Sequence, residues 1–184
     1  MKKFLFLIFA IFISGFAKKI TIKDVVDYYN KGYYQKACLE GNQIFNKIKK
    51  NEDLVTLYAF SCLKADYIDR LAVPIIALRK TKRARANAAY FSAILMQKKL
   101  LYHALLDNID ISGLKLPETD YILSKIFTMF TKKEYDKKNG IYVFKDPDDS
   151  EITYKMYIDQ GRNHKKIVIL KFKKDKLIKK YQYW

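Results

Sequence analysis

The spacing of apolar residues changes once along this chain, at Asn139 and Gly140, and this change constrains the fold more than any other feature. From Thr21 to about Phe130, apolar residues recur every three or four positions, which is typical of amphipathic α-helices. Beyond Gly140, short runs of β-branched and aromatic residues are separated by polar turns, which is typical of strands. The sequence therefore predicts an α+β protein, mainly α, with a helical region followed by a small sheet.

Helix-stopping residues divide the first region into short helices. We expect helices over 20–31, 33–50 and 54–66, a further one starting near Val73, and others over 84–97, 100–109 and 117–137. The start near Val73 follows from Pro74, because proline is accommodated only in the first turn of a helix. Lys98 and Lys99 mark either a turn between two helices or a solvated patch on one.

Four β-prone runs, over 141–144, 152–158, 167–172 and 177–183, predict a four-stranded antiparallel meander. Apolar and polar residues alternate in the second run, so we expect one face of the sheet to be buried and the other solvated. The preceding helix or the helical region would cover the buried face. The exposed face is expected to present a basic and aromatic surface formed by Lys155, Tyr157, Lys171 and Lys173.

Part of the helical region carries a spaced motif: a glycine, an aromatic residue two positions later and a small residue three further on. These are Gly32, Tyr34 and Ala37; a shift of 33 places Ala65 and Tyr67 at the first two positions, and a shift of 67 places Ala104 at the third. Arg70 takes the small position of the second copy, and Lys99 and Leu101 replace the glycine and aromatic of the third. Over residues 21–109 this pattern resembles the tetratricopeptide repeat (TPR). The resemblance implies stacked antiparallel helix pairs with a concave surface for protein binding, and an irregular helical bundle is the alternative.

The first nineteen residues have the parts of an export signal. Two lysines precede an unbroken apolar run over 4–13, and Gly15 and Ala17 are small residues at the spacing that a signal peptidase accepts. The run is shorter than the roughly 20 apolar residues of a bilayer-spanning helix. We expect cleavage after Ala17 and a periplasmic protein. Retention of the uncleaved segment as an inner-membrane anchor is the alternative.

The two cysteines fit this compartment. Cys38 precedes Asn51 by 13 residues and Cys62 follows it by 11, so both would lie at similar height in an antiparallel helix hairpin that turns near Asn51. Exported proteins meet an oxidising environment in which two cysteines tend to pair. We therefore expect a disulfide between Cys38 and Cys62, the alternative being two small buried residues that only pack together.

The formal net charge of +17 favours anionic partners, and loss of Lys2 and Lys3 with the export signal leaves +15. Export makes nucleic acid an unlikely partner and leaves an acidic protein, anionic lipid headgroups or a wall polymer; alternatively, the lysines are only solvated surface. The densest basic run covers 79–85, and it either binds an anion or complements the carbonyls of a helix end. The residues expected to bind an anionic partner are Arg79, Lys80, Lys82, Arg83, Arg85, Lys98 and Lys99.

No motif in the sequence predicts a catalytic residue, a metal site or a cofactor. His103 and His164 lack a neighbouring nucleophile or metal-ligand pattern. The acidic residues over 146–151 lack the glycine and the distal glutamate of a calcium-binding loop, so we interpret them as a solvated hairpin turn.

The sequence thus predicts a signal peptide over 1–17, a TPR-like helical array over 18–115, and a helix with a sheet over 116–184. The function that fits best is a non-enzymatic adaptor or assembly factor for another envelope protein, with no transmembrane helix in the mature chain. The alternatives are a basic binder of anionic envelope polymer or lipid headgroups, and an enzyme with an unrecognised site. Salt separates the first two, because charge-driven binding weakens as salt screens it.

Overall fold

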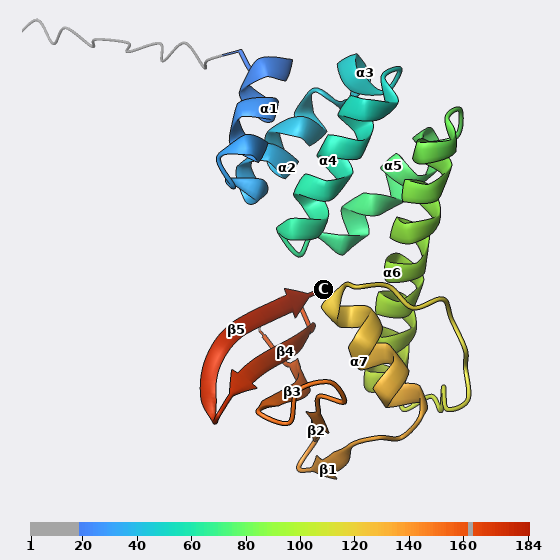
Figure 1. The fold of residues 1–184 in the computed structure, drawn as a ribbon, viewed down its shortest axis with the longest axis vertical. Helices are drawn as coiled ribbons and strands as arrows, with labels where there is room; N and C mark the ends of the chain where they lie inside the picture. Colours follow the sequence, from blue (N-terminus) through green and yellow to red (C-terminus); the bar gives the residue numbers. More distant parts are fainter. Residues whose placement is uncertain (1–18, 162–163) are drawn as a thin grey trace, which may run out of the picture.

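The computed structural model describes residues 19–161 and 164–184, and the predicted export signal therefore lies outside the described residues. Within the described chain, helices come first and a five-stranded antiparallel sheet follows, which confirms the predicted α+β class with a predominance of helix. The short helices form one end of the molecule and the sheet the other, and one long helix extends from the first part into the second (Figure 1).

Local capping signals set where several helices begin. Thr21 and Asp24 form a capping box at the start of the first helix, Asn51 accepts two main-chain hydrogen bonds at the start of the fourth, and Thr81 caps the longest. The elements are α1 (Ile22–Asn30), α2 (Tyr34–Gln43), α3 (Phe45–Ile48), α4 (Glu52–Lys64), the 3-10 helix η1 (Ile68–Leu71), α5 (Ala72–Ala77), α6 (Lys82–Asp107) and α7 (Ile122–Thr131).

Three predicted helix boundaries are wrong. The segment over 33–50 divides near Ile44 into α2 and α3. The segments over 84–97 and 100–109 form the single helix α6, because no glycine or proline interrupts them and Lys98 is buried rather than placed in a turn. Helix α7 ends at Thr131, because Lys133 adopts a positive φ of 59° that stops the helix before the predicted end at 137.

The turns that follow α1 and α4 have the same hydrogen bonds. After α1 the N–H of Tyr33 donates to the carbonyl of Tyr28, and after α4 the N–H of Tyr67 donates to the carbonyl of Cys62. Gly32 and Asp66 take the corresponding left-handed positions, with φ of 77° and 62°. The spacing from Tyr33 to Tyr67 is one residue longer than the shift of 33 that the motif predicts. The third copy of the motif forms no such turn, because Lys99 and Leu101 lie inside α6.

A disulfide joins Cys38 in α2 to Cys62 in α4, as predicted. Both cysteines are completely buried, and their Cα atoms lie 4.8 Å apart. The bond fixes the first helix pair to the second across a sequence separation of 24 residues.

The sheet is a meander in the order β1 to β5, with each strand antiparallel to the next. Its strands are β1 (Asp136–Lys138), β2 (Ile141–Lys145), β3 (Ile152–Asp159), β4 (Lys166–Lys173) and β5 (Lys176–Tyr183). The prediction of four strands missed β1. Asn139 and Gly140 both have positive φ, at 50° and 77°, and form the tight hairpin turn that pairs β1 with β2.

The inner face of the sheet packs against α6 and α7. Tyr154 and Met156 of β3 are buried on this face, and Lys171 is the direct neighbour of Tyr154 on β4, so Lys171 also belongs to the inner face. Lys173, two residues along β4, lies on the same face. The prediction that Lys171 and Lys173 share the exposed face with Lys155 and Tyr157 is therefore wrong for these two lysines.

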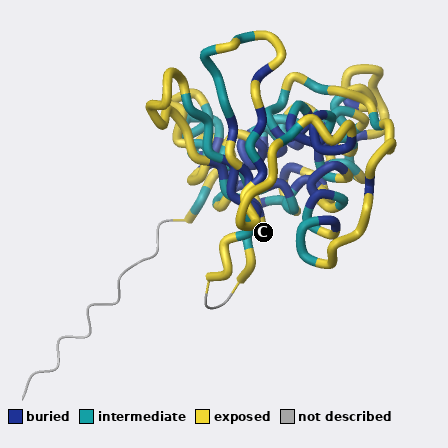
Figure 2. The backbone as a smooth tube through the Cα atoms, turned by 90° about the horizontal axis from the view of Figure 1, so that it is seen from below, coloured by how far each residue is buried: buried dark blue, intermediate teal, exposed yellow. Residues whose placement is uncertain are grey.

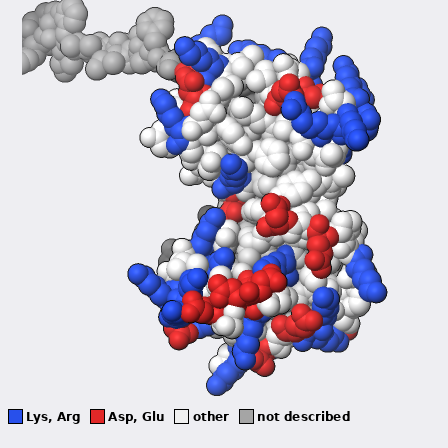
Figure 3. Space-filling view, viewed as in Figure 1, with Lys and Arg blue, Asp and Glu red and all other residues white. Residues whose placement is uncertain are grey.

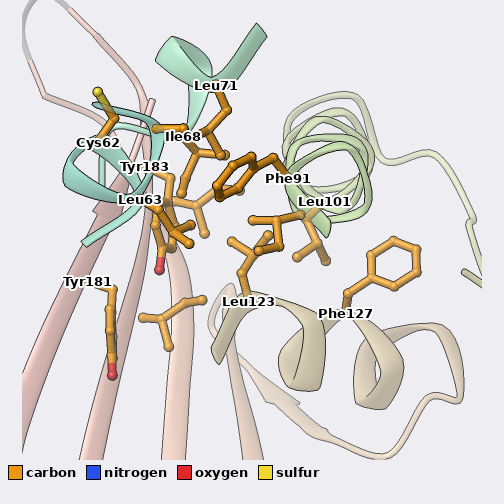
Figure 4. Packing of buried hydrophobic residues seen from close by; sticks show 14 of the residues in the cluster. Cys62, Leu63, Ile68, Leu71, Phe91, Leu101, Leu123, Phe127, Tyr181 and Tyr183 are labelled. Atoms are coloured by element: carbon orange, nitrogen blue, oxygen red, sulfur yellow. The ribbon is translucent and has the colours of Figure 1, made fainter. Parts of the chain in front are cut away.

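One hydrophobic core joins the helices to the sheet. Side chains from α4, η1, α6, α7 and β5 converge between the two parts, and Leu71, Leu101, Leu123 and Tyr183 are almost fully buried there (Figure 4). Buried positions lie in the interior of the molecule, and most positions in the connecting loops are exposed (Figure 2). Because α6 contributes to the core along its length, the helical end and the sheet end share this core.

Candidate functional site

A groove of about 710 Å³ opens at the helical end of the molecule, between the turn from α3 to α4 and the segment from α5 to α6. Figure 3 shows basic side chains gathered at this end, around the start of α6. The groove is lined by Phe45, Lys49, Lys50, Glu52, Val73, Ile76, Ala77, Arg79 and Lys80.

The floor of the groove is apolar and exposed. Helix α5 buries Pro74 against the rest of the protein, which leaves Val73 and Ile76 on its outer side. Val73 is 52% exposed and Ile76 is 76% exposed, and Phe45 lies beside them in the lining. An isoleucine this exposed, next to two other apolar side chains and inside a concave surface, is typical of a binding surface.

The rim of the groove is basic. Lys49 and Lys50 follow α3 on one side, and Arg79 and Lys80 follow α5 on the other. All four side chains are exposed. In the part of the chain that the structure describes, none of them forms an ion pair with a carboxylate, and Lys49 donates only to the Asn46 side chain, at 3.1 Å. The groove therefore presents four positive charges around an apolar floor. It also contains the carboxylate of Glu52, which forms no ion pair with these four side chains among the described residues.

Glu52, the first residue of α4, fixes the geometry of the rim. Its carboxylate accepts hydrogen bonds from the main-chain N–H groups of Arg79, Lys80 and Thr81, at 2.8, 2.6 and 2.9 Å. The Lys80 N–H contributes most to lowering the pKa of this carboxyl, which falls from 4.5 to about 2. Glu52 is thus ionised at neutral pH and attaches the segment after α5 to the start of α4.

The other predicted residues of the 79–85 run have different roles. The guanidinium of Arg83 pairs with Asp53, and that of Arg85 donates to the carbonyls of Arg79 and Lys80. Lys82 is exposed at the start of α6. The structure therefore brings only Arg79 and Lys80 of this run into the groove.

Lys98 and Lys99 lie away from the groove, and both bind Asp69. The Lys98 side chain is 1% exposed and its ammonium donates to Asp69 at 2.8 Å and to the main-chain oxygen of Trp184, which connects η1, α6 and the end of β5. Burial lowers the pKa of Lys98, although Asp69 opposes this effect. Lys99 reaches the other oxygen of Asp69 at 2.8 Å. Lys98 is a structural residue and is not available to an external anion.

The residues of the repeat motif lie in turns and in the core. Gly32 forms the turn after α1, Tyr34 begins α2, and Ala37 is fully buried beneath them. Ala65 follows α4, and the hydroxyl of Tyr67 accepts a hydrogen bond from Gln35 at 2.8 Å. Ala104 is buried in α6. The motif residues therefore form turns and packing contacts: Gly32, Tyr34, Ala37, Ala65, Tyr67 and Ala104.

Other titratable side chains form ion pairs or hydrogen bonds with one another. The Lys125 ammonium binds Asp146 and Asp148, at 3.1 and 2.8 Å, and the Tyr154 hydroxyl also donates to Asp146. His103 is exposed on α6, 3.7 Å from Asp107. Over residues 19–161 and 164–184, no three acidic, histidine or cysteine side chains gather in a way that would hold a metal ion.

Sequence reasoning found Arg79 and Lys80 but missed the rest of the groove. Phe45, Lys49 and Lys50 are about 30 residues from Val73 and Ile76 in sequence, and only the packing of α5 beside the start of α4 brings them together. The sequence did contain one indication of an exposed apolar surface. Val73 and Ile76 are large apolar residues on opposite sides of Pro74, in a helix too short to bury both.

Comparison with protein families, with curated proteins and with solved structures finds no match to this chain. Among the described helices, none combines the length and the apolar character needed to cross a bilayer.

Proposed function

We propose that this protein is an exported, non-enzymatic adaptor that binds an acidic segment of another envelope protein in the groove between α3 and α5. The observation that carries the proposal is the exposed Ile76 in a groove lined by four cations and by one carboxylate, that of Glu52, whose oxygens accept hydrogen bonds from main-chain N–H groups. An acidic segment with one or two large apolar side chains complements both properties: its side chains would cover Ile76 and Val73, and its carboxylates would meet the rim.

The repeated turn supports an adaptor role. Equivalent hydrogen bonds after α1 and α4 recur at a 34-residue spacing, from Tyr33 to Tyr67, which is the period of TPR proteins. The same bond, from Glu134 to Met129, also follows α7 outside the repeat region, so the support comes from the spacing. Such arrays commonly bind proteins through surfaces formed by neighbouring helices. The lining of the groove includes no histidine, serine, threonine or cysteine among the described residues.

The disulfide and the leader support the proposed compartment. A bond between Cys38 and Cys62 is typical of proteins that fold in an oxidising environment. We propose that the segment over 1–17 directs export and is removed after Ala17, which gives a periplasmic protein.

The experiment uses a model ligand, a fluorescent peptide in which glutamates surround a central leucine and phenylalanine. We expect anisotropy titration to show saturable binding that Ile76→Ser weakens about tenfold or more, since an isoleucine that becomes buried contributes about 1.5 to 3 kcal/mol. The double variant Arg79→Glu/Lys80→Glu should abolish binding. The matched control Lys23→Glu/Lys31→Glu makes the same change of charge at the start of α1 and at the residue that follows it, both exposed, and should bind as the native protein does.

A second function, binding of an anionic envelope polymer, is favoured by the four rim cations and the net charge of +17. Polyphosphate serves as the polymer probe. If the polymer function is correct, polyphosphate binds, Ile76→Ser leaves its affinity unchanged, and moderate salt removes the binding. If the protein-binding function is correct, the peptide binds more tightly than the polymer and retains part of its affinity in salt.

A further inference from the structure

The outer face of the sheet is a second surface, at the opposite end of the molecule from the groove (Figure 1). The strand registers place two rows of residues across this face. One row contains Val143, Lys155, Leu170 and Lys180, and the next contains Lys145, Thr153, Phe172 and Leu177. Each row therefore places apolar and basic side chains next to one another on neighbouring strands.

Helices cover the inner face of the sheet, and these rows lie on the opposite side. Val143, Leu170, Phe172 and Leu177 belong neither to the hydrophobic core nor to the side chains packed against it, as far as the described chain extends. Leu177 is 48% exposed, and Ile178 beside it is 50% exposed. Val143, Leu170 and Phe172 are half-buried, and Val168 on the same face is fully buried, so the exposed apolar part of this face lies toward Leu177.

The three lysines in these two rows form no ion pair with the described part of the chain. Lys145, Lys155 and Lys180 are exposed and form no ion pair with any described residue. The ammonium of Lys155 lies 5.0 Å from the centre of the Phe172 ring, so its side chain extends over the apolar surface with its charge held there. In contrast, Lys173 and Lys174 at the nearby hairpin pair with Glu151.

This arrangement limits what can cover the face. A second copy of the chain would bring Lys155 and Lys180 against the same lysines and bury like charges. A partner helix usually docks on a continuous apolar strip with charges at the edge, whereas Lys155 lies in the middle of this face. An anionic lipid surface meets both needs, because its headgroups contact each lysine and its interfacial region accepts the apolar side chains between them.

We propose that the outer face of the sheet docks on a phospholipid membrane with anionic headgroups. Lys145, Lys155 and Lys180 contact the phosphates, and Phe172 and Leu177 enter the interface. This docking is peripheral and reversible, and the elements that form the groove lie at the other end of the molecule (Figure 1).

The test is flotation of the purified protein, without the leader, with vesicles of phosphatidylcholine alone and of phosphatidylcholine containing phosphatidylglycerol. We expect binding only to the vesicles with phosphatidylglycerol. Lys155→Gln/Lys180→Gln should reduce the partition coefficient about thirtyfold, given the contribution of each lysine near an anionic surface. The control Lys23→Gln/Lys31→Gln removes the same charge from the start of α1 and from the residue after its end, and it should reduce the partition coefficient less than threefold because these lysines lie outside the docking face.

Leu177→Ser separates the apolar contribution from the charges. Because Leu177 is half exposed, the variant should melt at the temperature of the native protein yet bind the anionic vesicles several-fold more weakly. Equal losses in the two double variants would show non-specific attraction to a basic protein and overturn the proposal. Absence of binding to either vesicle, with intact protein, would also overturn it and would favour a protein partner for this face.

Discussion

The disulfide between α2 and α4 allows a quantitative test of how the helical end is stabilised. Its cysteines are separated by 24 residues, and closing a loop of this length in the unfolded chain contributes about 3 kcal/mol to the free energy of unfolding. Reduction of the native protein removes the cross-link and retains both sulfur atoms. The difference between the oxidised and reduced forms therefore measures the cross-link itself.

The variant Cys38→Ala/Cys62→Ala measures a second quantity. Both cysteines are completely buried, so removing the sulfur atoms leaves unfilled volume in addition to opening the loop. We expect the variant to be on the order of 1 kcal/mol less stable than the reduced native protein, since a free cysteine packs as a small apolar residue.

The assay is urea unfolding at neutral pH, followed by far-ultraviolet circular dichroism, with the free energies obtained by linear extrapolation. The predicted order of stability is oxidised, reduced, then the alanine variant. Equal unfolding free energies for the oxidised and reduced protein would refute the reasoning, because a closed loop of this length cannot leave the unfolded chain unconstrained.

Three further predictions concern single residues. Gly41→Ala should destabilise the protein by about 1 to 3 kcal/mol in urea unfolding, because the added Cβ would lie 2.7 Å from the buried Tyr58 ring; an unchanged midpoint would contradict this packing. The pKa of Glu52 is lowered in the folded protein, so its ionised carboxylate stabilises the fold above pH 4.5, and this stabilisation should disappear as the pH falls through about 2. Glu52→Gln should remove that part of the dependence of stability on acid pH, and hydrogen exchange of the Lys80 amide measures it. Lys98→Met should cost about 1 to 3 kcal/mol by urea unfolding, since the main-chain oxygen of Trp184 loses its donor while Asp69 keeps Lys99; a neutral result would place Lys98 outside the joint between α6 and β5.

Much of the fold follows from local patterns. The change of spacing at Gly140 separates helices from strands, and the positions of Cys38 and Cys62 about a turn near Asn51 are enough to predict the disulfide. The missing strand β1 was also encoded locally. Asn139 followed by Gly140 is a strong hairpin signal, but the charged segment before it has too little apolar character to suggest a strand.

Other features depend on tertiary contacts. Lys98 resembles a surface lysine in sequence, and only the arrival of Asp69 and the end of β5 makes its burial possible. The pairing of Lys171 with Tyr154 on the neighbouring strand places Lys171 on the inner face of the sheet. Its side chain is half-buried there, at the edge of the core. The groove is the clearest case, because neither its apolar floor nor its rim is continuous in sequence.

Site-specific photocrosslinking in living cells tests the central claim, that the groove binds a partner protein, most directly. A photoreactive amino acid replaces Ile76 in the groove, and a second variant carries it at Met96, a residue on α6 that is 53% exposed and outside the groove lining. We expect a discrete crosslinked protein from position 76, absent from position 96 and lost when Arg79→Glu/Lys80→Glu is added. The same crosslinks from both positions, or a crosslink from 76 that survives the charge reversal, would contradict the proposed groove interaction.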